Sequence, residues 1–84
     1  MYELTDLQAR VYFVIRNHGP IGPTNIGLHL EFQHEYVSSK VRRPIAALVR
    51  KGLVKREAKN KRVVTYSSIH EHAPPLIVTE NVED

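Results

Sequence analysis

The chain contains no cysteine and no long apolar run. Without cysteine it can form neither a disulfide nor a cysteine-ligated zinc site. Its longest apolar stretches, such as residues 76–78, are far too short to span a bilayer. The residues after Met1 lack the basic and apolar regions of a secretory signal. We therefore expect a protein of the cytoplasm that makes no membrane contact.

The chain is also short, and 84 residues are enough for one domain with one small core. Hydrophobic residues make up 42% of it, which is ordinary for a globular protein and argues against overall disorder. No internal repeat or low-complexity segment is present. In the absence of disulfides, only this core or a partner chain can hold the fold together.

Acidic residues are almost missing from one stretch of the chain. Residues 40–62 contain ten Lys or Arg and a single acid, Glu57, whereas the rest of the chain contains two basic and eight acidic residues. A solvated charged face is the plainer interpretation of a basic stretch, but it does not account for this concentration. A positive block of such density predicts a polyanionic partner, and we favour nucleic acid.

Two helices are predicted before this block. Residues 5–8 (Thr-Asp-Leu-Gln) have the form of a capping box, and apolar residues at helical spacing continue to Gly19-Pro20, which predicts a helix over residues 5–18. Pro23 suits the first position of a helix and predicts a second one over residues 23–30. We expect the connection between them to be extended, with one strand-like pairing at most.

A third helix is predicted over residues 36–51, from an apolar stripe that ends at Gly52. Pro44 lies inside this segment, where it removes one backbone hydrogen bond and crowds the preceding turn. We therefore expect a bend near residues 40–44. The alternative is a shorter helix that begins near Lys40.

Two segments rich in Val, Thr and Tyr follow, and they predict strands over Leu53–Glu57 and Arg62–Ser67. Residues 58–61 would join them in a hairpin turn, for which Asn60 is well suited. Three helices followed by a basic hairpin is the order of a winged helix-turn-helix domain. The predicted fold is mainly α with a small antiparallel wing of two or three strands, over residues 1–69.

Residues 70–84 are predicted to form an acidic tail with a short strand at 76–79. Three interpretations are open for the apolar residues 76–78. They can pack inside the chain, add a strand to a partner or remain disordered. The helices and the wing already supply a core, and Pro74-Pro75 favours an extended path away from the domain. We therefore expect the tail to be the contact of a homodimer.

The third helix is the predicted recognition helix. At about 100° per residue, Ser39, Arg43, Ala46 and Arg50 fall opposite the core-facing Val41. A helix in the major groove needs such a small or basic face, because Arg can pair with guanine and Ala permits a close approach. The predicted DNA-binding residues of the helices and the wing are Thr24, Ser38, Ser39, Lys40, Arg42, Arg43, Ala46, Arg50, Lys59, Asn60, Lys61 and Arg62.

Several residues resemble a known family. Those similar to the first two helices of the LexA repressor DNA-binding domain are Leu4-Thr5, Gln8, Val11, Ile15-Arg16, His18, Thr24, Ile26, Leu30 and Phe32. Ala47-Leu48 and Arg50–Val54 resemble the end of its recognition helix and the start of its wing, a pattern shared with MarR-like regulators. The resemblance implies sequence-specific duplex binding through residues 38–46 and wing contacts with the DNA backbone. We expect no self-cleaving protease domain.

The sequence offers no constellation for catalysis or metal binding. His70 and His72 supply two metal ligands without a third, and Ser38-Ser39 lack the surroundings of a nucleophile. We expect no enzyme, no metal, no cofactor and no evident small-molecule ligand. The predicted function is that of a transcriptional regulator that binds double-stranded DNA. The alternative is a winged helix that docks an acidic protein.

Overall fold

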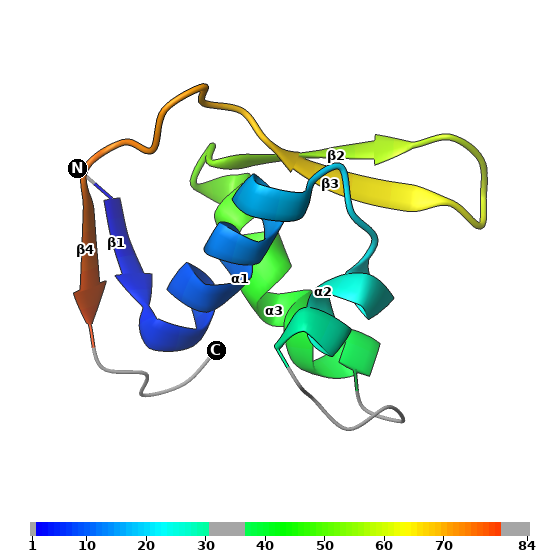
Figure 1. Ribbon diagram of the computed structural model, residues 1–84, viewed down its shortest axis with the longest axis horizontal. Helices are drawn as coiled ribbons and strands as arrows, with labels where there is room; N and C mark the ends of the chain where they lie inside the picture. The colour runs from blue at the N-terminus through cyan, green and yellow to red at the C-terminus, as the bar shows by residue number, and fades with distance from the viewer. Residues whose placement is uncertain (1, 31–36, 80–84) are drawn as a thin grey trace.

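The computed structural model describes residues 2–30 and 37–79, and of residues 37–40 it describes the backbone alone. Within these ranges the helices and strands follow the predicted order, with one strand at either end (Figure 1). In chain order they are β1 (Tyr2–Thr5), α1 (Asp6–His18), α2 (Pro23–His29), α3 (Val37–Arg50), β2 (Val54–Ala58), β3 (Val64–Ser68) and β4 (Leu76–Thr79). Three helices and the antiparallel β2–β3 hairpin confirm the winged-helix fold.

α1 begins at the predicted capping box. The Thr5 hydroxyl accepts a hydrogen bond from the Gln8 amide at 3.2 Å, and the Gln8 side-chain oxygen accepts one from the Thr5 amide at 3.1 Å. The helix ends at Gly19, whose amide donates to the Ile15 carbonyl. A Cβ atom at Gly19 would lie 2.5 Å from that carbonyl oxygen, so glycine is required by close approach.

α3 is one continuous helix that contains Pro44, so the alternative of a start near Lys40 is wrong. Its end is a Schellman motif, in which the Leu53 amide donates to the Leu48 carbonyl and the Gly52 amide to the Val49 carbonyl. Gly52 has a φ of 80°, in the left-handed region that favours glycine. This turn reverses the chain and directs it into β2.

The core lies between the three helices and the first residues of the hairpin. The predicted stripe of α3 is buried there, with Val41 and Leu48 fully inaccessible and Ile45 nearly so. The other large buried side chains come from the elements before α3 and from the two residues Leu53 and Val54 at the start of the hairpin. They are Leu4, Val11, Tyr12, Ile15, Ile21, Ile26, Leu30, Leu53 and Val54.

The hairpin strands lie one to two residues later in the chain than predicted, and Arg62 belongs to the turn rather than to β3. The reason is Asn60, whose side-chain oxygen accepts hydrogen bonds from the amides of Arg62 and Val63, at 2.8 and 2.9 Å. A strand pairing of those amides is thereby replaced by a local turn. The expected single pairing before α2 is present, between Ile21 and Tyr66.

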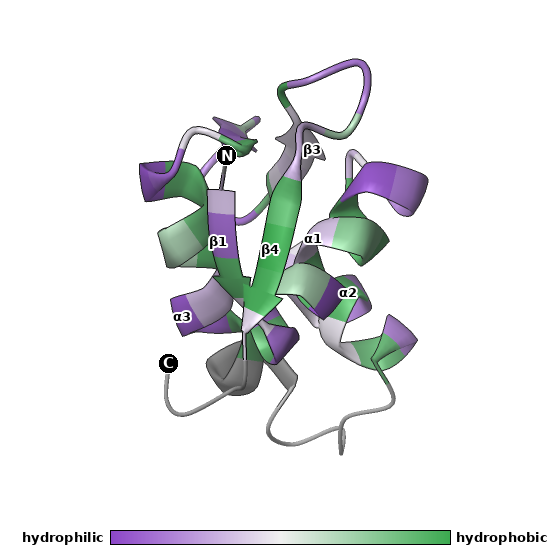
Figure 2. Cartoon of the chain, turned by 90° about the vertical axis from the view of Figure 1, so that its left-hand side faces the viewer, coloured by the Kyte–Doolittle hydropathy of each residue, from purple (hydrophilic) through white to green (hydrophobic). Residues whose placement is uncertain are grey.

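The tail is where the structure departs most from expectation. Residues 76–79 form the predicted strand, but β4 pairs in parallel with β1 of the same chain, with Leu4 opposite Val78 (Figure 2). Leu76 packs against the core, and the Thr79 hydroxyl donates to the Leu4 carbonyl. The prediction that Pro74-Pro75 leads the chain away from the domain is therefore wrong. The backbone of residues 2–5, which no sequence pattern marked as a strand, provides the pairing.

The hydroxyl group of Tyr12 is buried without a polar partner among the described residues. Tyr12 is fully inaccessible, and its hydroxyl has no hydrogen bond with any residue in the described part of the chain. Burying an unpaired hydroxyl costs about 1–3 kcal/mol. We predict that Tyr12→Phe leaves the free energy of unfolding unchanged or raises it by about 1 kcal/mol, whereas Tyr12→Ala lowers it by about 3–5 kcal/mol. Urea unfolding followed by circular dichroism measures both, and a clear loss of stability in Tyr12→Phe would contradict the prediction.

Candidate nucleic-acid interface

The outer face of α3 carries the predicted basic residues. Arg42, Arg43, Ala46 and Arg50 are all exposed, on the opposite side from the buried stripe of this helix. Ser38, Ser39 and Lys40 belong to the first turns of the helix, but their side chains lie outside the described part of the structure. The helix thus presents cations along its length while its other face anchors it in the core.

The turn of the hairpin holds the second predicted group. Lys59, Asn60, Lys61 and Arg62 are exposed there, and the Lys59 amide donates to the Val63 carbonyl across the turn. The side-chain oxygen of Asn60 is already used by two backbone amides. Asn60 therefore has a structural role in the turn in addition to its predicted DNA contact. Its side-chain NH₂ group is the part left for a ligand.

Glu57 is the one acid within the basic block of residues 40–62. Its carboxylate lies 3.4 Å from the Lys55 ammonium group, and both side chains are about half exposed. Exposed pairs of this kind contribute little stability. The pair lies in β2, away from the cations of the hairpin turn.

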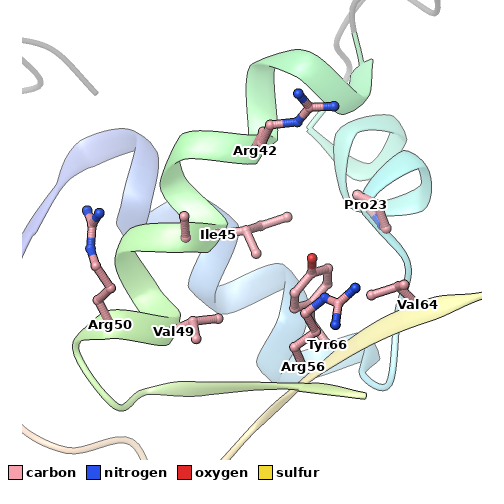
Figure 3. A pocket seen from close by; sticks show the side chains of 9 residues that line it. Pro23, Arg42, Ile45, Val49, Arg50, Arg56, Val64 and Tyr66 are labelled. Atoms are coloured by element: carbon pink, nitrogen blue, oxygen red, sulfur yellow. The ribbon is translucent and has the colours of Figure 1, made fainter. Parts of the chain in front are cut away.

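α3 and the hairpin enclose a recess of about 530 Å³ (Figure 3). Three arginines line it, Arg42 and Arg50 from the helix and Arg56 from β2, together with Ala46. None of its lining residues is acidic. The helix and the strands of the hairpin form opposite walls of the recess, and the hairpin turn lies beyond its lining.

The recess changes two of the residue assignments. Arg42, which was not among the residues predicted to lie opposite Val41, lines the recess with Ala46 and Arg50, whereas Arg43 is exposed outside it. Arg56 was missed by the sequence analysis. It is the strand partner of Tyr66, and both side chains line the recess. Arg56 could have been identified from the alternation of side chains along β2 together with the register of the hairpin, which places it opposite Tyr66.

The structure also shows where Thr24 and the two histidines of the tail lie. Thr24 is exposed in the first turn of α2, beside Pro23, which lines the recess. His70 and His72 lie in the connection between β3 and β4, and no three metal-ligating side chains gather in residues 2–30 or 37–79. Over the same ranges no helix has the length and apolar character needed to cross a bilayer.

A comparison with protein families assigns the chain to one of them. Residues 4–74 match the family described as penicillinase repressor. The chain belongs to the penicillinase repressor family. The family consists of winged-helix DNA-binding repressors, typically dimeric, and is not a family of enzymes. No match to this chain was found among curated proteins or among solved structures.

The match includes the three helices, the hairpin and most of the connection that follows, and it stops before β4. The likeness to the LexA and MarR groups stays a resemblance, since the family that matches is a different one. The DNA-binding, helix-turn-helix and transcription-regulation predictions are confirmed at the level of the family.

Proposed function

We propose that this member of the penicillinase repressor family binds duplex DNA with α3 in the major groove. The observation that carries the proposal is the geometry of its cations. The basic face of α3 and the basic hairpin turn flank one recess without a lining acid, while the apolar face of α3 is buried. A duplex presents a groove beside a phosphate backbone, and the helix and hairpin of this fold match those two features.

The base contacts are assigned to α3. Arg43 and Arg50 each have the five donors that pair bidentately with guanine, and Ala46 between them allows the helix to approach the base edges. Ser38, Ser39 and Lys40, at the start of the helix, complete the proposed reading face.

Phosphate contacts are assigned to the hairpin and α2. Lys59, Lys61 and Arg62 extend from the hairpin turn toward the backbone or the minor groove, and Thr24 offers its hydroxyl from α2. These contacts position the helix on the duplex and contribute most of the affinity that does not depend on sequence.

We predict that binding to a duplex of random sequence weakens steeply with salt, and that Lys61→Ala reduces the slope of log K against log salt by about 1, because one phosphate contact is lost. Lys51→Ala is the matched control, since Lys51 is exposed near β1 and lies outside the recess lining. We expect Lys51→Ala to keep the slope. Fluorescence anisotropy between 50 and 300 mM salt, roughly the range over which such contacts weaken, measures all three proteins.

If the protein gave no mobility shift with random duplex DNA at micromolar concentration and low salt, the DNA proposal would fail. The acidic-protein alternative would then be preferred.

The second test concerns sequence discrimination. We predict that Arg43→Ala lowers the preference for the selected site over random DNA by about 1–3 kcal/mol, because a guanine contact is lost. The site is first obtained by selection from a random duplex pool. Arg10→Ala, an exposed arginine of α1, is the control and should keep the preference. Loss of discrimination in Arg42→Ala but not in Arg43→Ala would show that the helix is rotated by one residue from the proposed register.

We also propose that two copies pair through β4. In the described part of the chain β4 pairs with β1 alone, so its other edge has no strand partner, and Ile77 and Val78 are 42% and 51% exposed. An exposed apolar edge strand is a ready template for a second strand. A two-fold pairing of β4 with its copy would give a four-stranded sheet. It would leave the hairpin turn, at the opposite end of the molecule, uncovered (Figure 1).

We predict that the full chain sediments as a dimer and that a chain ending at Ile69 sediments as a monomer. Because that truncation also removes the partner of β1, a point variant keeps the test decisive. In Ile77→Lys the new ammonium group would lie opposite Glu3 in the β1–β4 pair, so the sheet within the chain should be preserved. The same charge should prevent the proposed apolar contact between two copies. Ile69→Lys, at a similarly exposed position outside the strands, should stay dimeric. A dimeric Ile77→Lys would refute β4 as the contact.

A further inference from the structure

The recess between α3 and the hairpin has a floor that DNA binding does not require. Ile45 and Val49 of α3, Val64 and Tyr66 of β3, and Pro23 of α2 line it. Phosphate and base edges are met by cations and hydrogen-bond donors, and of these five side chains Tyr66 alone offers a donor. Its volume of about 530 Å³ falls in the range of about 300–1,000 Å³ that is usual for small-molecule sites.

Two polar groups lie at the edge of this floor. Arg42, Arg50 and Arg56 all contribute to the lining, and Figure 3 shows the guanidinium group of Arg56 beside Tyr66, its partner on the neighbouring strand, whereas that of Arg50 points away from Tyr66. Tyr66 is half-buried, and its hydroxyl points into the recess. A large apolar surface with a few polar groups at its edge is the composition of a ligand pocket.

We propose that this recess binds an amphiphilic organic anion, an aromatic body that carries one carboxylate or sulfonate group. The ring lies on Ile45, Val49 and Val64, and the acid group accepts a charge-assisted hydrogen bond from Arg56 and a hydrogen bond from the Tyr66 hydroxyl. The three arginines favour this charge over a neutral or cationic ligand of the same shape.

The consequence for regulation rests on the proposed DNA function. The bound anion occupies the space between the two walls that would hold the duplex, and its acid group adds a negative charge there. It therefore lowers the affinity for DNA, and by linkage DNA lowers the affinity for the anion by the same factor. The recess would make this repressor sensitive to a small molecule.

The first experiment measures binding of 8-anilinonaphthalene-1-sulfonate to the folded full chain by its fluorescence. We expect saturable binding of one probe per chain. N-phenyl-1-naphthylamine has the same rings without the sulfonate. We expect its affinity to be lower by at least about tenfold, because it forms no charge-assisted hydrogen bond.

Two matched variants locate the site. Val49→Glu places a carboxylate in the recess and should weaken sulfonate binding by at least about tenfold, because like charges are then juxtaposed. Val63→Glu makes the same change at a similarly exposed valine outside the recess lining, and it should bind like the unaltered chain. Circular dichroism of each variant checks that it is folded. Equal binding by Val49→Glu and the unaltered chain would overturn the proposal.

The second experiment titrates the sulfonate into a complex of the protein with a labelled duplex. We expect the apparent Kd for DNA to rise by at least about tenfold at saturation, with a midpoint that follows the affinity for the probe. A protein that binds DNA but not the sulfonate retains the proposed function and loses this inference. A protein that binds the sulfonate in the recess but no duplex retains the site and loses the proposed function. Binding of both without competition would refute the regulatory coupling.

Discussion

The apolar stripe of α3 is the contact on which the rest of the molecule depends. Val41, Ile45 and Leu48 are buried against residues of α1 and α2, and this packing sets the rotation of α3 about its own axis. Because side chains at three- and four-residue spacing share one face, the burial of these three turns Arg42, Ala46 and Arg50 outward. The orientation of the proposed DNA-binding face is thus a direct consequence of how the core is filled.

The hairpin depends on the same core through its first residues. Leu53 and Val54 are buried directly after the glycine turn that ends α3, and β3 is held to the connection before α2 by the Ile21–Tyr66 pair. The hairpin is therefore attached at its base, while its basic turn extends from the helical body (Figure 1). This arrangement accounts for the recess, since α3 and the hairpin diverge from a shared anchor.

The β1–β4 pair extends beyond the segment that matches the family. The family match stops before β4, yet this strand covers the start of the chain and brings Leu76 onto the core. It also supplies the exposed apolar edge through which two copies are proposed to pair. A repressor that acts on two-fold symmetric DNA needs such a contact away from its reading helix.

The amino-acid sequence by itself determined the features that depend on neighbouring residues. The capping box at Thr5 and Gln8, the stripe of α3 and its glycine end, and the concentration of cations in residues 40–62 were all predicted, because each rests on short-range spacing. The tertiary structure alone decided the features that join distant residues. The parallel pairing of residues 2–5 with 76–79 spans nearly the whole chain. The strand at 76–79 was predicted, but its partner was not, because residues 2–5 have no distinctive strand pattern. The assignment of Arg42 and Arg56 to one recess likewise required the hairpin register and the position of α3, since proximity between elements is set by packing and not by local sequence.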